Sequence, residues 1–201
     1  QLAIDARPPP DSRIDGPVVA SRASVEEIER RAERVLERVP DYVWDGKTLP
    51  VPVDQIADSH FGLLVCEMEY LKVAQGAPVV ACDQDFSGLL LPDRREIWVN
   101  AAEARDWPGR RRFTISHELG HWCMHRDDGG PIYCRQGLIA EAEERPERPL
   151  PEREADAFAA ALLMPARLMR REYERDRDFG VLCGRFNVSG KAMGRRLHAV
   201  I

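Results

Sequence analysis

The chain has 201 residues, of which 44% are apolar, and a formal net charge of −5. This length fits one domain, or one domain with a small appendage, and the apolar content suffices for a packed core. The negative charge argues against a protein that grips nucleic acid over its whole surface. No stretch approaches the roughly 18 apolar residues of a membrane span, and the first residues lack the apolar run of a secretion signal, so we expect no membrane partner.

The cysteines indicate a reducing compartment. There are five of them, an odd number, and none form a C-x-x-C pair: Cys66, Cys82, Cys123, Cys134 and Cys183. This usage is typical of free thiols and predicts a cytoplasmic protein. Cys134 could reach a metal as an inhibitory thiolate, but an ordinary loop cysteine is the simpler interpretation.

The N-terminal region predicts a tail followed by a helix. Residues 1–22 are rich in proline and lack periodicity, which is typical of a flexible tail. Ser24 and Glu27 then form a capping-box pattern, and apolar residues recur at helical spacing as far as Val39. We expect this helix either to pack on the domain that follows or to bind a partner as a free arm.

The next segments predict a small antiparallel sheet, and hence an α+β fold. A short helix over residues 53–60 precedes an alternating strand over residues 63–71. Two further short strands, 88–91 and 96–99, flank a Pro-Asp-Arg-Arg turn. Such a sheet either has a purely structural role or offers an edge along which an extended peptide binds.

The strongest motif is an H-E-x-x-H sequence at residues 117–121. Residues four apart lie on one face of a helix, so His117 and His121 can both direct a ring nitrogen at one zinc ion. Glu118 is turned by about 100° from His117, which places its carboxylate beside the metal as a general base. The alternative is an amphipathic helix with two surface histidines.

Charged or metal-binding side chains also occur at both ends of this helix. Arginines occupy positions 110–112, where cations oppose the helix dipole, so we expect a solvated face rather than a substrate contact. His125 lies about 12 Å beyond His117 along the axis, too far to share a metal. A motif with a third histidine requires a glycine turn, and Met124 and Asp127 stand where its glycine and histidine would be. We therefore predict that His125 lines the cleft or supports a ligand.

A third metal ligand is predicted in the helix that begins at Pro151 and ends before Pro165. Glu152 and Asp156 fall on its apolar face, one turn apart, whereas Glu154 is turned by about 200° and faces away. Carboxylates directed at a core are costly unless something neutralises them, so we predict that Glu152 binds the zinc. Asp156 would accept a hydrogen bond from a ligating histidine. The alternative is that both acids are solvated.

Between His125 and Pro151 the sequence predicts a loop of about 25 residues, and long loops beside active sites often act as lids. Tyr133 in this loop is a candidate catalytic residue. Its hydroxyl could donate a hydrogen bond to the tetrahedral oxyanion, because such sites need a donor besides zinc.

The C-terminal residues 166–201 predict a helical segment that resembles a helix-turn-helix over residues 179–197. From Val181 onward the segment carries cations and no acid, so DNA binding is a legitimate hypothesis, although no DNA-binding residue can be specified. Gly190 and Gly194 would weaken a recognition helix. We therefore favour docking of this segment on a peptidase domain formed by residues 23–165.

Two stretches together resemble the ImmA/IrrE family of metallopeptidases. One is Arg-Phe-Thr-Ile-Ser-His-Glu-Leu-Gly-His at residues 112–121, and the other is Glu-x-x-x-Asp-Ala-Phe-Ala-Ala-x-Leu-Leu-Met-Pro at residues 152–165. The resemblance extends over roughly residues 50–201. It implies a compact intracellular zinc-peptidase domain that often acts on a helix-turn-helix repressor encoded nearby. Family members usually carry Asn at the position of Asp156, and Asp can perform the same orienting role.

We therefore predict a zinc-dependent endopeptidase, with manganese as the alternative metal. His117, His121 and Glu152 would bind the ion, and Glu118 would be the general base. The predicted substrate is a helix-turn-helix repressor, whose cleavage would derepress genes of a stress response or a mobile element. The alternative is a regulator that binds a repressor or DNA without proteolysis and keeps the metal site as a structural feature. The sequence predicts no oligomeric state.

Overall fold

The computed structural model describes residues 23–69, 86–126, 132–135 and 149–201. The predicted tail, Cys82 and most of the predicted lid loop lie outside these residues. Within them, no helix is both long and apolar enough to cross a membrane. Three cysteines whose side chains are described carry free thiols: Cys66, Cys123 and Cys183.

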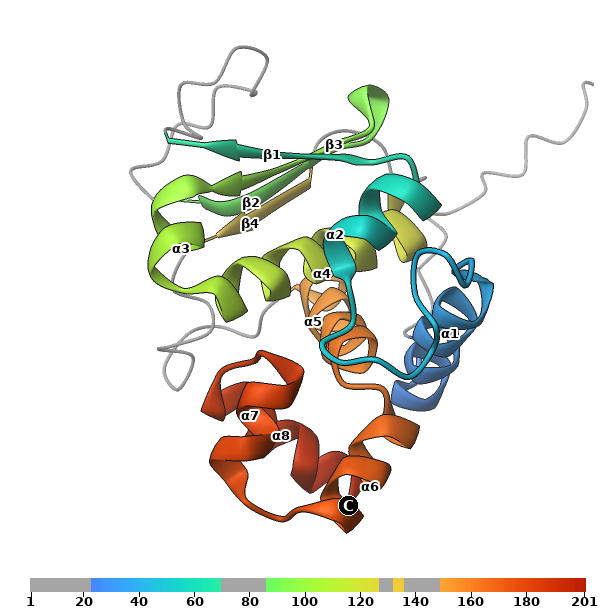
Figure 1. Ribbon diagram of the computed structural model, residues 1–201. Helices are drawn as coiled ribbons and strands as arrows, with labels where there is room; N and C mark the ends of the chain where they lie inside the picture. The colour runs from blue at the N-terminus through green and yellow to red at the C-terminus, as the bar shows by residue number, and fades with distance from the viewer. Residues whose placement is uncertain (1–22, 70–85, 127–131, 136–148) are drawn as a thin grey trace, which may run out of the picture.

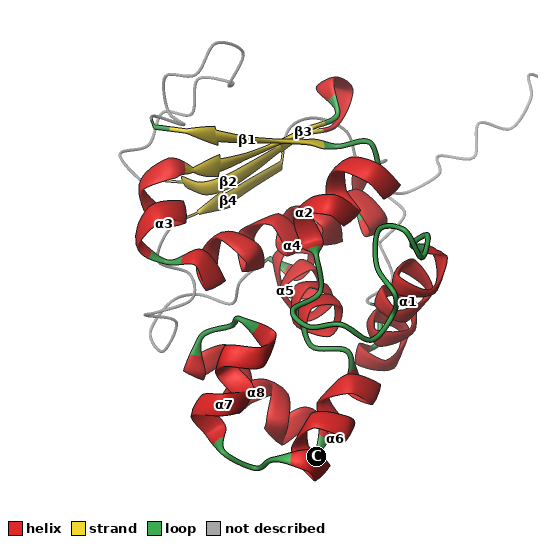
Figure 2. Cartoon of the chain, in the orientation of Figure 1, coloured by secondary structure: helices red, strands yellow, loops and turns green. Residues whose placement is uncertain are grey.

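In the described part of the chain, four strands form one sheet that lies against the helix α4 (Pro108–Met124) (Figure 1). Their order across the sheet is β1 (Leu64–Met68), β3 (Glu96–Asn100), β2 (Phe86–Leu91) and β4 (Ile132–Arg135). The fold class is α+β, as the sequence predicts. Most of the helices lie below the sheet in the view of Figure 2.

The sheet is mixed, so the prediction of a wholly antiparallel sheet was wrong. β2 pairs antiparallel with β3 and with β4, whereas β1 runs parallel to β3. The short turn of Pro92–Arg94 joins β2 and β3 as a hairpin, and β4 occupies the other edge of β2. β1 therefore pairs at the free edge of β3, where it runs parallel to its neighbour.

β4 lies in a region where the sequence predicted a loop. Its backbone pairs with β2, with Tyr133 opposite Leu89 and Cys134 opposite Gly88. A four-residue strand beside Gly-Gly-Pro carries little periodicity of its own. It forms because β2 presents an edge, and that information is not local in the sequence.

α4 lies between the sheet and the helix α5 (Leu150–Leu163) (Figure 1). On the sheet side, Leu90 and Ile97 share a core with Ile115 and Leu119 of α4, and none of these four side chains is exposed. On the other side α4 crosses α5 closely, because a Cβ on Gly120 would lie 3.0 Å from the Cα of Ala155. Because the two helices cross at Gly120, His117 and His121 of α4 lie beside the first turn of α5.

Arg111 and Arg112 at the start of α4 have partners within the chain, which corrects the prediction of a solvated face. Arg112 is buried and donates a hydrogen bond of 2.7 Å to the Val51 carbonyl. Arg111 pairs with Asp54 at 2.5 Å and with Glu67 at 2.8 Å. These partners come from the segment before β1 and from β1 itself, which pack beside the helix start. The negative charges of Asp54 and Glu67 offset the unfavourable position of cations at a helix N-terminus.

The remaining N-terminal elements cover α4 and α5. The helix α1 (Val25–Arg38) begins with the predicted cap, in which the Ser24 hydroxyl accepts from the Glu27 amide, and it packs against α5. The predicted short helix is found as α2 (Val53–Gln55) and the π-helical turn η1 (Ile56–His60). A helix that the sequence did not predict, α3 (Ala101–Asp106), follows β3.

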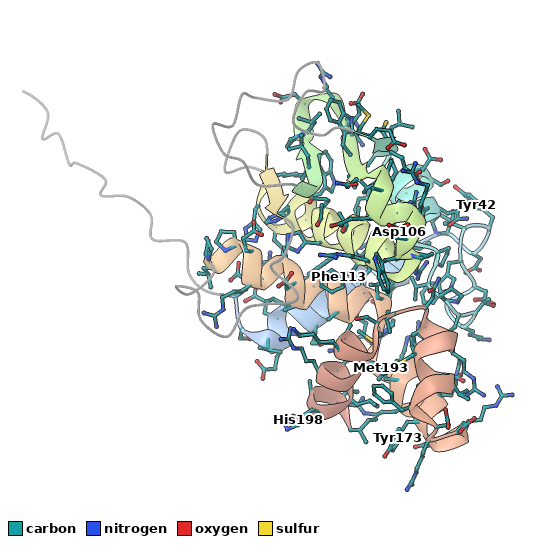
Figure 3. All side chains as sticks on the ribbon, turned by 90° about the vertical axis from the view of Figure 1, so that its left-hand side faces the viewer. Tyr42, Asp106, Phe113, Tyr173, Met193 and His198 are labelled. Atoms are coloured by element: carbon teal, nitrogen blue, oxygen red, sulfur yellow. The ribbon has the colours of Figure 1, made fainter. Side chains whose placement is uncertain are left out.

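The C-terminal residues form α6 (Ala166–Arg175), α7 (Phe179–Phe186) and α8 (Gly190–Val200). α7 and α8 are joined by a turn as in a helix-turn-helix. Met193 on α8 is buried, whereas His198 lies at the surface (Figure 3). Arg196 is 5% exposed and joins α8 to the rest of the chain, as described below.

Candidate metal centre

Three side chains from two helices converge at one point. His117 and His121 on α4 are fully buried, and their Nε2 atoms lie 3.0 Å apart. Glu152 in the first turn of α5 places one carboxylate oxygen 3.2 Å from His121 Nε2 and the other 3.4 Å from His117 Nε2. One ligand atom from each residue can be chosen so that all three lie within 4.8 Å of one another. The structure thus brings together the three residues that the sequence predicted as ligands.

Asp156 lies one turn beyond Glu152, beside His117. Its Oδ1 is 2.9 Å from His117 Nδ1. An ionised carboxylate only accepts hydrogen bonds, so Nδ1 carries the proton and Nε2 keeps its lone pair. Nε2 is the atom that faces His121 and Glu152. Asp156 therefore selects the tautomer that a metal ligand requires.

The charge states of the other two groups also suit a metal. Burial lowers the pKa of His121, which favours the neutral imidazole. Burial alone would raise the pKa of Glu152, but the adjoining imidazoles of His117 and His121 hold it well below its usual range. Two imidazole nitrogens and one carboxylate are a donor set that fits zinc, with manganese as a weaker match. The residues present therefore fit the predicted ion.

Glu118 is fully buried beside this centre. Within the described residues, neither oxygen of its carboxylate has a hydrogen-bond partner. Burial raises the pKa of Glu118 to about 8. A buried carboxyl without partners is costly, and a carboxyl whose pKa lies near neutrality can both take up and release a proton. The geometry therefore gives Glu118 the properties that a general base needs.

His125 lies one turn beyond His121 and outside the group of three converging residues. Its ring centre is 5.5 Å from that of His121, and its Nε2 lies 3.4 Å from an oxygen of Glu154. The other oxygen of Glu154 accepts a hydrogen bond of 2.8 Å from the Ala23 amide. Glu154 is only 8% exposed, so the prediction that it faces away was wrong. Ala23, which precedes the N-cap of α1, covers that side of α5, and the sequence of α5 alone could not show this.

Two further residues complete the surroundings. Tyr133 lies on β4, but its side chain is outside the described part of the structure, so its oxyanion role stays a prediction. Gly88 on β2, which sequence reasoning did not select, approaches α4 so closely that a Cβ there would lie 2.9 Å from a Glu118 oxygen. A glycine at the start of a predicted strand was the available signal, because a glycine in a strand often marks a close approach of the backbone.

Fold and site together define a metallopeptidase-like protein: one helix carries the H-E-x-x-H motif, a second supplies the carboxylate, and a small sheet lies against the first. The family model of the IrrE N-terminal-like domain (Peptidase_M78) matches residues 61–198. The chain belongs to this family.

A search of curated proteins found no match. Among solved structures, a Mycobacterium tuberculosis transcriptional regulator matches with a TM-score of 0.51 and 20% sequence identity. The match covers 86% of this chain and 47% of the regulator, so the chain spans about half of that protein's length. At this identity the likeness concerns the fold alone.

Proposed function

We propose that the protein is a zinc-dependent endopeptidase. The observation that carries the proposal is the convergence of His117, His121 and Glu152 beside a buried Glu118 that has no hydrogen-bond partner among the described residues. Structural zinc sites are closed by four protein ligands, whereas catalytic sites use three and keep one position open. The described residues at this centre supply three.

Access to the centre supports a catalytic role. The side chains of His117 and His121 are at most 1% exposed, whereas those of Glu152 and Asp156 are 15% and 29% exposed. The centre thus reaches solvent on the α5 side. A peptide can approach from that side, while the histidine rings stay fixed inside the core.

The residues divide the work as follows. Bound zinc would polarise the scissile carbonyl and make water a nucleophile near neutral pH. Glu118 takes the proton from the attacking water and later gives it to the leaving amine. Asp156 holds His117 in one tautomer and orientation through the hydrogen bond to Nδ1.

We further propose that the substrate is a helix-turn-helix repressor and that its cleavage, in the cytoplasm, derepresses genes of a stress response or a mobile element. The support for this substrate is the resemblance of the two motifs to the ImmA/IrrE family and the chain's membership of the IrrE-like family. The geometry of the centre supports a protein substrate in general and selects no particular sequence.

The alternative is a regulator that binds DNA or a repressor through the basic C-terminal helices. Two of the cations in that segment have internal partners. Arg185 lies 2.9 Å from Glu172, and Arg196 is buried and paired with Glu29. The Arg196 pair docks the segment on α1, whereas the Arg185 pair joins α7 to α6 within the segment. Cations that are paired in this way add little to a phosphate-binding surface. We therefore retain the peptidase as the main proposal.

The test is the intact mass of the repressor encoded beside this protein, after incubation with the zinc-loaded protein or with its Glu118→Gln variant. We expect a single cut by the wild type alone. An uncut repressor that forms a complex with both proteins would favour the binding regulator instead.

A further inference from the structure

β2 and α4 approach each other most closely at Gly88. A Cβ on this residue would lie 2.4 Å from the Thr114 methyl carbon and 2.9 Å from the Glu118 oxygen Oε1. Real Cβ atoms essentially never make contacts this short. A residue with any side chain would therefore have to displace the threonine, the glutamate or the strand.

The two side chains that Gly88 faces have little room to move. Thr114 and Glu118 lie one turn apart on the same face of α4, and they are 3% and 0% exposed. Both oxygens of Glu118 lack a hydrogen-bond partner among the described residues, so packing rather than hydrogen bonding holds its carboxylate on this side. The backbone of β2 at Gly88 is the surface against which that carboxylate rests.

A separate device fixes β2 in this position. The pairing of β2 with β4 contains a bulge between Phe86 and Gly88, and bulges bend a strand locally. The Ser87 hydroxyl, at the bulge, donates a hydrogen bond of 3.2 Å to Glu103 on α3. Glu103 also lies 3.4 Å from Arg110 at the start of α4. The residue before Gly88 is thus tied to the same helix that carries Glu118.

We propose that Gly88 is a positioning residue for the reaction. Because Gly88 has no side chain, the β2 backbone lies directly against the Glu118 carboxylate. This contact keeps the carboxylate beside His117, His121 and Glu152. This inference rests on the proposed function, because it assigns Glu118 the role of the base. A side chain at position 88 would move the carboxylate away from its working position, even where the fold and the metal ligands survive.

The decisive variant is Gly88→Ala combined with Thr114→Ser. The serine removes the methyl carbon of the 2.4 Å contact but leaves the contact with Glu118. Thr114→Ser alone provides the reference. Relative to it, we expect the double variant to bind zinc within about threefold and to show little change in KM. Its kcat should fall by on the order of 10²-fold, as for a misplacement of about 1 Å.

A readout without catalysis tests the contact itself. Gly88→Ala should lower the thermal midpoint by several degrees. This loss should shrink in the Thr114→Ser background and also in the Glu118→Ala background, since each removes one atom that the new Cβ meets. Gly109→Ala is the matched control. Gly109 lies in the first turn of α4, away from Glu118, and its new Cβ would lie 3.3 Å from the Asn187 carbonyl oxygen. It should change the midpoint without lowering kcat.

The outcomes separate the two proposals. A wild-type protein that cleaves no repressor, or a Glu118→Gln variant that cleaves normally, contradicts the proposed function. A wild type that cleaves, together with a Gly88→Ala/Thr114→Ser variant that cleaves as fast as Thr114→Ser, contradicts the positioning role. Loss of folding or of zinc binding in the double variant also contradicts it, because the alanine would then act through the fold or the metal ligands.

Discussion

The candidate metal centre and the C-terminal helices both bury carboxyl groups, but these groups differ in whether they have hydrogen-bond partners. In the C-terminal helices, Glu172 is 4% exposed and accepts hydrogen bonds from Arg171 and Arg185. At the metal centre, Glu118 is fully buried and its carboxylate has no such partner within the described residues. Buried charges that are paired hold elements together, whereas a buried carboxyl without a partner is retained at a cost in stability.

Arg196 shows the structural use of a buried charge. It donates a hydrogen bond of 2.9 Å to the Met164 carbonyl at the end of α5 and pairs with Glu29 on α1. One guanidinium therefore joins the C-terminal helices to two elements of the preceding domain. His117 and His121 are fully buried, and their Nε2 atoms meet at a point where an ion could bind. Arg196 thus stabilises the packing of the helices, whereas the two histidines are arranged as in a metal site.

The largest effect is expected for Glu118→Gln. The amide keeps the shape of the side chain but cannot accept the proton, so activity should fall by about 10²–10⁴-fold or more, while zinc binding is retained. Cleavage rates and zinc content of the purified variant provide the check. Loss of zinc from the variant, or activity equal to that of the wild type, would contradict the proposed role of Glu118 as the base.

The two acids Glu152 and Glu154 should respond differently. Glu152→Ala removes a proposed ligand and should weaken zinc binding by more than about 100-fold, because a ligand matters more than the residues that orient it. Glu154→Ala should leave zinc affinity nearly unchanged. It removes the acceptor of the Ala23 amide and the carboxylate beside His125, so the free energy of unfolding should fall by about 1–2 kcal/mol. Competitive zinc titration and urea unfolding measure both quantities, and equal effects on zinc would refute the assignment of the third ligand.

Asp156 should have an intermediate effect. Asp156→Ala removes the acceptor at His117 Nδ1, which should lower zinc affinity by roughly 10–100-fold. Asp156→Asn keeps an acceptor oxygen at the same position and should lose much less. The comparison uses the same zinc titration. Equal losses for the alanine and asparagine variants would show that the charge of Asp156, and not its hydrogen bond, is what matters.

Arg196→Met tests the structural side of the comparison. It breaks the pairing with Glu29 and the bond to the Met164 carbonyl, and should destabilise the protein by about 2–3 kcal/mol, less than for a fully buried pair because Glu29 is partly exposed. Zinc affinity should stay within about twofold of wild type, since no ligand is touched. Denaturant unfolding and zinc titration give the two values. A variant that loses zinc in proportion to stability would show that the two regions are energetically coupled.

The smallest effect is expected at the exposed Asp45. Hydrogen bonds from the Thr48 amide and hydroxyl and from the Lys47 amide lower the pKa of Asp45 to about 2. A folded-state pKa below the usual value stabilises the fold above that usual value, and the contribution is lost as the pH falls toward 2. Thermal midpoints of wild type and Asp45→Asn should therefore differ slightly at pH 6 and converge near pH 2. A constant difference would mean that ionisation of Asp45 is not involved.

The parts of the centre that the sequence predicted depend on local geometry. The spacing of His117 and His121, and of Glu152 and Asp156, follows from the helical repeat, and the structure places each pair on one face of its helix. That the two faces meet was inferred from the cost of directing acids at a core. The fold class followed from the same periodicities.

The corrections all concern contacts between segments far apart in the chain. Glu154 is buried because residue 23 covers it, and Arg111 is paired because Asp54 and Glu67 pack beside it. The parallel pairing of β1 and the short strand β4 depend on which sheet edges are available. The close approach at Gly88 requires the position of β2 over α4. None of these has a local signal strong enough to predict it.

The measurement that tests the central claim most directly is X-ray absorption at the zinc edge of the purified protein loaded with one equivalent of the metal. We predict nitrogen and oxygen scatterers at about 2.0–2.2 Å, with two imidazoles and no sulfur, as for a centre of His117, His121 and Glu152. In Glu152→Ala, this first shell should change. A sulfur shell at about 2.3 Å would contradict the claim, because a cysteine such as Cys134 would then bind the ion and the site would not be the open centre proposed here.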